Sequence, residues 1–273
     1  MSISAKAPRW LYRLAISRHR WQRRLRWFFS TARYAKDFVI QDLPVTVFRH
    51  KSLLLRKLGD ADMRLQHNKI TNLKIASERL HRIVMKPGET FSFWKLVGEP
   101  TERRGYVEGM LLSQGEVVTG IGGGLCQLAN LLYWIALHSP LTVVERYRHS
   151  FDPFPDSGRV LPCGSGATIF YNYIDLQFRN DTGAMFEFLV WVDDTHLQGE
   201  LRSDALPSQT YHVIEKSHRF LCERATNIFF RANELYQQIR DRRTGNVIEE
   251  RLVCKNHSRM KYQPPEGAVI EDV

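Results

Sequence analysis

In residues 8–30, apolar residues recur at regular intervals and arginines occupy many of the positions between them. Helical spacing relates its apolar residues, which are Trp10, Leu14, Trp21, Leu25 and Phe28. Most positions between them are basic or polar. The pattern predicts a basic amphipathic helix near the N-terminus.

After residue 60, the spacing of the hydrophobic residues alternates between the period of a helix and that of a strand. Residues 60–84 show helical spacing and stop at Pro87 and Gly88, and residues 125–138 form a stronger helical pattern. Short segments rich in aromatic and β-branched residues are typical of strands, and they lie at 90–98, 116–120, 141–149, 167–180 and 185–194. We therefore expect an α+β fold, in which helix 125–138 packs on one face of a mixed or antiparallel sheet and helix 60–84 flanks it.

The last quarter of the chain is more polar, and Thr244, Gly245 and Asn246 predict the turn of a hairpin. We divide the chain into a basic N-terminal arm (1–40), a core domain (41–199) and a C-terminal β-rich subdomain (200–273). No internal repeat or low-complexity linker marks the borders.

The positive charge of the protein belongs to the arm. Residues 1–36 hold ten Lys or Arg and no acidic residue, whereas 29 basic and 29 acidic residues balance in the rest of the chain. A basic helix with aromatics on one face suits an anionic membrane surface. A helix packed on the domain is the main alternative, and phosphate contacts with nucleic acid are the least favoured.

No run of residues approaches the roughly 20 apolar positions needed to cross a bilayer, and the start lacks the pattern of a secretory signal. We expect a cytoplasmic protein. If the basic helix binds lipid, the protein would lie at the inner face of the membrane. The four cysteines are far apart and form no C-x-x-C pair, which favours reduced thiols. We assign no metal site and no cofactor.

The segment "GIGGGLCQLANLLYWIALHS" carries the strongest chemical signal. Glycines at 120 and 122–124 permit a tight turn with uncovered N–H groups, directly before Cys126. A cysteine in the first turn of a helix meets the positive end of the helix dipole, which lowers the thiol pKa. The N–H groups could then stabilise an oxyanion, with Gln127 or Gln114 as a further donor.

A thiol enzyme also needs a base. His149 ends the predicted strand 141–149, and Asp152 and Asp175 are the nearest carboxylates that could orient its ring. The order of a helix-borne Cys, a strand-borne His and a later polar residue is that of papain-like thiol enzymes.

Two other interpretations of the segment stay open. In the first, Cys126 is a buried structural thiol, since buried cysteines behave as small hydrophobes. A glycine turn at a helix start also binds anions, although no Lys-Ser/Thr follows it as a P-loop requires. Cys126, His149 and Cys163 match no zinc module.

Four separated motifs, in order, resemble the VanW family over about residues 64–192. They are "KPGETFSFWKLVGEPTERRGY", "GIGGGLCQLANLLYWIAL", "ERYRHS" and "ATIFYNYIDLQFRNDT". The resemblance implies a setting in glycopeptide resistance, with a cell-wall precursor or related peptide as partner. Relatives carry an acidic residue before the Ala-Thr of the last motif, where this chain has Gly166.

The resemblance also selects residues. The family's glycines fall on Gly122, Gly123 and Gly124, its Cys-Gln on Cys126 and Gln127, and its His-Ser on His149 and Ser150. Two hypotheses follow: a Cys126/His149 thiol hydrolase or acyl-transfer enzyme acting on peptidoglycan precursors, or a non-catalytic module that binds a cell-wall fragment or a partner resistance protein.

Overall fold

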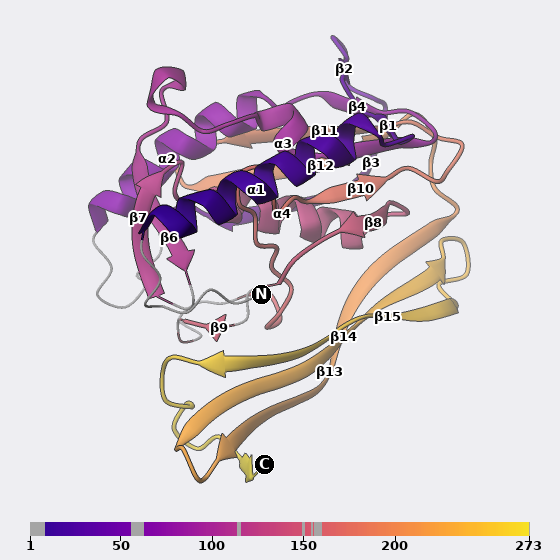
Figure 1. The fold of residues 1–273 in the computed structure, drawn as a ribbon. Helices are drawn as coiled ribbons and strands as arrows, with labels where there is room; N and C mark the ends of the chain where they lie inside the picture. The colour runs from indigo at the N-terminus through magenta and orange to yellow at the C-terminus, as the bar shows by residue number, and fades with distance from the viewer. Residues whose placement is uncertain are drawn as a thin grey trace.

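The computed structural model describes residues 9–55, 63–113, 116–148, 151–153, 155 and 160–272, with 9–13, 113 and 116–117 described by their backbone alone. The described helices are α1 (Arg9–Phe28), α2 (Met63–Glu78), α3 (Phe93–Val97) and α4 (Cys126–Leu137), with a 3-10 turn η1 at Glu102–Arg104. Helices and separate sheets combine as Figure 1 shows, which confirms the predicted α+β class.

The central sheet is antiparallel and has the order β2-β4-β11-β12-β3. Its strands are β2 (Asp37–Phe38), β4 (Ile83–Met85), β11 (Phe186–Val192), β12 (His196–Ser203) and β3 (Val45–Leu53). A second sheet has the order β1-β5-β10-β8, formed by β1 (Arg33–Tyr34), β5 (Glu89–Ser92), β10 (Gln177–Arg179) and β8 (Thr142–Glu145). A hairpin of β6 (Glu108–Ser113) and β7 (Glu116–Ile121) stands beside α2.

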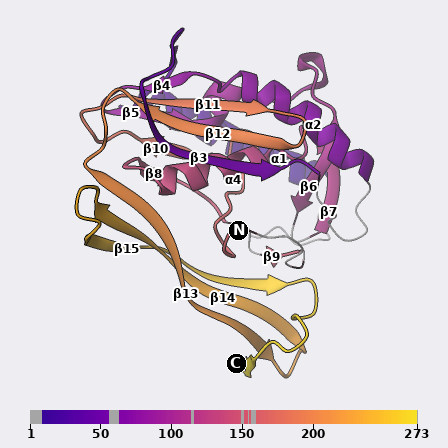
Figure 2. The ribbon, with the colours of Figure 1, turned by 180° about the vertical axis from the view of Figure 1, so that it is seen from behind.

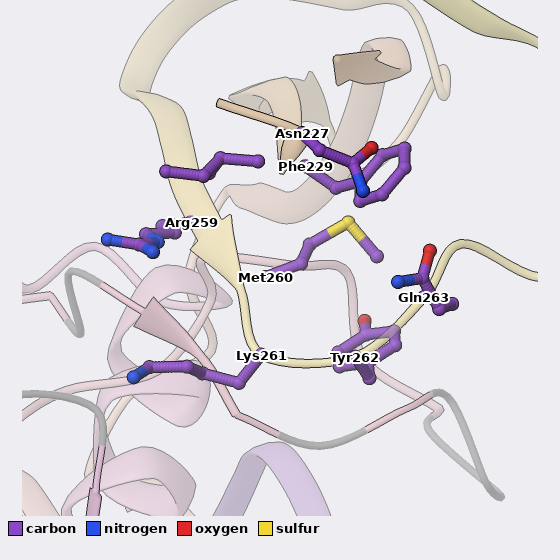
Figure 3. A pocket seen from close by; sticks show the side chains of 8 residues that line it. Asn227, Phe229, Arg259, Met260, Lys261, Tyr262 and Gln263 are labelled. Carbon is purple, nitrogen blue, oxygen red and sulfur yellow. The ribbon is translucent and has the colours of Figure 1, made fainter. Parts of the chain in front are cut away.

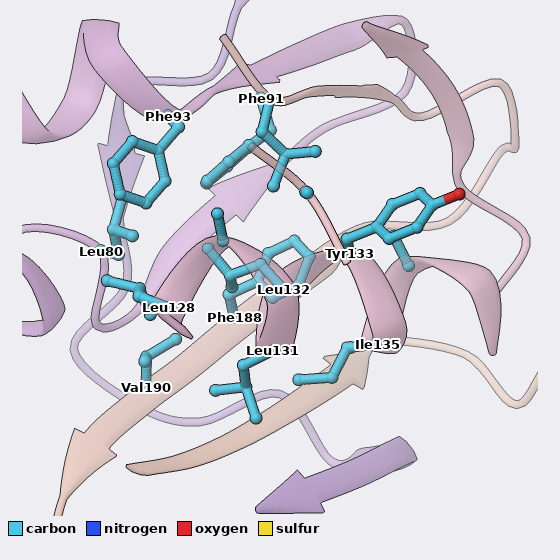
Figure 4. Packing of buried hydrophobic residues seen from close by; sticks show 14 of the residues in the cluster. Leu80, Phe91, Phe93, Leu128, Leu131, Leu132, Tyr133, Ile135, Phe188 and Val190 are labelled. Carbon is cyan, nitrogen blue, oxygen red and sulfur yellow. The ribbon is translucent and has the colours of Figure 1, made fainter. Parts of the chain in front are cut away.

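Helix α4 packs against the central sheet and forms the middle of the core. Gly199 in β12 leaves the space that Leu131 and Ile135 occupy, because a side chain at 199 would collide with both. Figure 4 shows the apolar side chains of α4 facing Phe188 and Val190 of β11. Residues 128, 129 and 131–137 are all buried, so α4 is covered on nearly every side.

The C-terminal sheet consists mainly of three long antiparallel strands, which twist together beneath the core in Figures 1 and 2. They are β13 (Gln209–Glu223), β14 (Ile228–Asp241) and β15 (Val247–Met260); β16 (Ile270–Asp272) and β9 (Phe151–Asp152) add at the two edges. Gly245, with φ +74°, forms the predicted turn between β14 and β15. Gln237 joins this sheet to the core by donating to the carbonyl at the end of α4, Leu137, at 2.8 Å.

Four predicted elements differ from the structure. The helix expected over 60–84 ends at Glu78, and Arg82, with φ +70°, turns the chain into β4. The strand expected over 90–98 stops at Ser92, whose side chain accepts from Lys95 N and begins α3. The strand expected over 141–149 ends at Glu145, and residues 167–180 form turns before the short strand β10.

Among the described residues, no helix has both the length and the apolar character needed to cross a bilayer. The borders predicted at 40 and 199 stay predictions.

Candidate functional site

The turn that leads into α4 is shaped by its packing. A Cβ on Gly123 would lie 2.1 Å from a backbone atom of Gly109 in β6, so that position accepts only glycine. Gly124 has φ +94°, a conformation that side chains disfavour. Asn72 of α2 donates to the Gly123 carbonyl at 2.9 Å and fixes the turn. Gly122 lines the pocket that contains Cys126, whereas Gly123 and Gly124 are explained by the contacts of the turn.

Cys126 is the first residue of α4 and is half-buried. Its thiol lies 4.0 Å from the carbonyl oxygen of Ile169, and Ile121 and Leu125 stand in the same pocket wall. Burial raises the pKa of the Cys126 thiol above its ordinary value. This is opposite to the direction expected for a thiol at a helix start, because desolvation outweighs the backbone hydrogen bonds at the sulfur.

The cavity beside Cys126 has a volume of about 270 Å³, and we call it the α1–α4 pocket. Its walls come from α1, from α3 and the residues that follow it, from the β6–β7 hairpin, from the turn and start of α4, and from the segment 169–173. The lining residues are Ile16, Arg20, Trp94, Glu99, Pro100, Leu111, Ile121, Gly122, Leu125, Cys126, Ile169, Phe170, Tyr171 and Tyr173. Most of the wall is apolar or aromatic, with few polar groups, as in sites for small organic ligands.

Arg20 is the basic group of the pocket wall. Its guanidinium donates to Glu99 Oε1 at 3.1 Å and lies 4.9 Å from the centre of the Tyr171 ring. The Nε atom of Arg20 is buried and has no hydrogen-bond partner among the described residues. A buried donor of this kind favours an acceptor, because leaving it unpaired costs about 1–3 kcal/mol.

Gln127 follows Cys126 but points to a different part of the molecule. Its amide donates to Ser52 Oγ and to the Leu53 carbonyl, both at 2.9 Å, at the end of β3. Gln127 does not line the α1–α4 pocket, so its amide holds α4 to β3.

Asp175 is fully buried behind the pocket wall. It accepts from Ser92 Oγ at 2.6 Å, from Trp94 N at 3.0 Å and from the Gln177 amide at 2.9 Å. Burial raises the pKa of Asp175 despite these hydrogen bonds. The carboxyl group thus holds the start of α3 and positions Trp94, whose side chain reaches the pocket.

Asp152 lies elsewhere, on β9 at the edge of the C-terminal sheet. It is buried and accepts from the Tyr262 hydroxyl at 2.7 Å, and the Arg231 guanidinium is 3.7 Å away. Asp152 and Asp175 are therefore members of two separate hydrogen-bonded clusters. The remaining predicted site residues, His149, Ser150 and Gln114, lie outside the described residues.

A second pocket, of about 350 Å³, lies at the far end of the C-terminal sheet. Its side chains come from the turn before β14, the end of β15 and the segment that follows (Figure 3). Asn227, Arg259, Lys261 and Gln263 give it a polar lining. None of the residues predicted for the site contributes to it.

The comparisons with known proteins decide the family. A family model described as "VanW like protein" matches residues 68–202. The vancomycin B-type resistance protein VanW of Enterococcus faecalis is 34% identical over 244 residues, which covers 89% of this chain and 88% of that protein. The chain belongs to the VanW family.

A further relative is the uncharacterized protein YoaR of Bacillus subtilis. It is 32% identical over 109 residues, which are 40% of this chain and 34% of YoaR. No solved structure matches the chain. The matched family region, 68–202, begins within α2 and ends one residue before the end of β12, so α1 and strands β13 to β16 of the C-terminal sheet lie outside it.

The sequence analysis did not identify Arg20 of α1 or its partners Glu99 and Tyr171 as site residues. Arg20 was one of many arginines in the basic helix, and Glu99 and Tyr171 were parts of motifs without an assigned role. The sequence does not reveal that Arg20 and Glu99 are in contact, because they are 79 residues apart. The position of Gly166 was noted, and its carbonyl accepts from the Arg146 guanidinium at 2.9 Å.

Proposed function

We propose that this protein is an accessory protein of glycopeptide resistance that binds a cell-wall precursor or related peptide in the α1–α4 pocket. The carrying observation is the buried Arg20 Nε, a donor without a partner among the described residues, in the wall of a mainly apolar and aromatic pocket. A ligand that brings a carboxylate to Arg20 satisfies this donor and gains a charge-assisted hydrogen bond.

The other pocket residues suit the remaining parts of such a ligand. Trp94, Phe170, Tyr171 and Tyr173 offer aromatic faces for apolar peptide side chains or sugar rings. Glu99 offers an acceptor for an amide or an ammonium group. The name of the Enterococcus faecalis relative supplies the biological setting, resistance to vancomycin.

Arg20→Gln tests this proposal. The probes are two short peptides that end in D-alanyl-D-alanine or D-alanyl-D-lactate, each compared with a form whose terminal carboxylate is blocked, by calorimetry. We expect the free carboxylate to bind and Arg20→Gln to weaken binding about tenfold or more, since a hydrogen bond to a charged group contributes about 1.5–3 kcal/mol.

Arg18→Gln is the matched control, because Arg18 is exposed on the same helix. It should leave peptide affinity unchanged. Equal weakening by both substitutions, or equal binding of the blocked peptides, contradicts a carboxylate contact at Arg20.

Thiol catalysis is the second candidate, and the position of Cys126 in the pocket wall favours it. In this alternative His149 removes the thiol proton, and the Cys126 sulfur attacks a carbonyl of the bound peptide. The bond to the amine or alcohol leaving group breaks, and that group takes the proton from His149. Water or an acceptor amine then releases the acyl group from the sulfur, as a hydrolase or an acyl-transfer enzyme does. The papain-like order of Cys, His and a later polar residue belongs to this candidate. It requires an ionised thiol near neutral pH.

A further inference from the structure

One side of α1 exposes a row of large apolar side chains to solvent. Leu14, Trp21, Leu25 and Phe28 are 58%, 61%, 47% and 81% exposed. Steps of seven, four and three residues place them on one side of the helix. We call these four residues the outer stripe of α1. They include most of the apolar positions from which the helix was predicted.

The opposite side of α1 attaches the helix to the core. Arg23 is buried and makes a two-pronged hydrogen bond with Glu145, and its guanidinium also donates to the Tyr173 carbonyl at 3.0 Å. Trp27 packs on the core, with Lys95 Nζ 4.8 Å from its ring centre. The contacts of Arg23 and Trp27 hold the helix in this orientation, so the outer stripe stays exposed to solvent.

Basic residues flank the outer stripe. Arg18, Arg24 and Arg26 are exposed, and no acidic residue occurs in the first 36 positions. An apolar stripe between arginines matches the boundary between lipid headgroups and acyl chains, where burial and phosphate attraction add. Two copies of the chain pairing through the same stripe would instead bring these arginines together, which is unfavourable.

We propose that the outer stripe of α1 docks this protein onto an anionic membrane surface. Trp21, Leu25 and Phe28 then enter the interface while the flanking arginines contact lipid phosphates. The docking does not depend on what the α1–α4 pocket binds. It does place that pocket just beneath the lipid surface, because Ile16 and Arg20 of the same helix line it.

The test is sedimentation of the full chain with vesicles of phosphatidylglycerol and phosphatidylcholine, compared with vesicles of phosphatidylcholine alone. The wild-type protein should bind the anionic vesicles, with an affinity that falls as salt is added. Trp21→Ser/Leu25→Ser should weaken this binding roughly tenfold or more, because two apolar side chains no longer enter the interface. Both positions are exposed, so thermal unfolding should show an intact fold.

Trp191→Ser/Leu252→Ser is the matched control, since it removes one exposed Trp and one exposed Leu from β11 and β15. Its vesicle binding should equal that of the wild-type protein. Three results would overturn the proposal: the wild-type protein does not bind anionic vesicles, it binds both vesicle types equally, or the control variant loses as much vesicle binding as the stripe variant. A wild-type dimer that the stripe variant abolishes, without any vesicle binding, assigns the stripe to a second copy and also overturns it.

Discussion

The ionisation state of one side chain, Cys126, separates the two candidate functions. Its surroundings are Ile121, Leu125 and the carbonyl of Ile169, none of which stabilises negative charge. The helix start could be recognised in the sequence, but the amount of water left around the thiol depends on segments more than 40 residues away.

Alkylation of Cys126 by iodoacetamide, followed by mass spectrometry of its peptide across a pH range, measures this state. We expect the rate to rise only above the ordinary thiol pKa of about 8.5, because burial raises the pKa of Cys126. Cys222, half-buried on β13, serves as the internal reference. A rate that is already maximal near neutral pH, and that falls in His149→Ala, would support thiol catalysis instead.

The glycines show what a motif can and cannot predict at a single residue. Their presence predicted a tight turn before a helix, and the structure has one. Their chemical role was assigned to uncovered N–H groups, whereas Gly123 is required by the backbone of Gly109. That requirement arises from the packing of β6 against the turn, which no local pattern reveals.

At the scale of elements, the sequence located α1 but not the side by which it attaches. Hydrophobic periodicity predicts that an amphipathic helix buries its apolar side. Here the described apolar stripe is exposed, and Arg20 and Arg23 face the core. Arginine turns inward only where its partners are in place, and Glu145 is 122 residues further along the chain.

Arg23→Ala should therefore destabilise the protein by about 3 kcal/mol, since it leaves Glu145 without its cation in a partly buried site beside Asp175. Chemical denaturation measures the loss. The exposed neighbour provides the control, because Arg24→Ala should change the unfolding free energy by no more than about 0.5 kcal/mol. Adding Glu145→Gln to Arg23→Ala should recover part of the loss; no recovery would contradict the buried pair as its cause.

At the scale of the whole molecule, three histidines meet where the core adjoins the C-terminal sheet. They are His138, which follows the end of α4, His50 of β3 and His212 of β13. Burial lowers the pKa of His138 to about 4, and neighbouring His212 and His50 act in the same direction. The His138 ring stacks on the Phe48 ring, with 4.2 Å between the ring centres, and this contact helps to cover it from water.

Acid should weaken the folded state through this cluster. Between about pH 6.5, where a histidine in the unfolded chain binds its proton, and pH 4, the folded His138 stays neutral, so the unfolding free energy falls as the pH falls. Denaturant unfolding across this window should show a flatter pH dependence in His138→Gln than in the wild-type protein. His67→Gln, at an exposed position, should keep the wild-type slope; an equal slope in all three proteins would contradict the assignment to His138.

The attachment of α1 also has a consequence for the order in which the protein is made. Glu99, Glu145 and Tyr173, which hold Arg20 and Arg23, stand 79 to 150 residues downstream of them. Chains leave the ribosome from the N-terminus, so α1 emerges long before the surface that receives it. The first 36 residues contain no Asp or Glu, so the arginines of α1 have no carboxylate partner within this part of the chain. A helix that meets lipid at this stage would reach the membrane first and gain its domain afterwards.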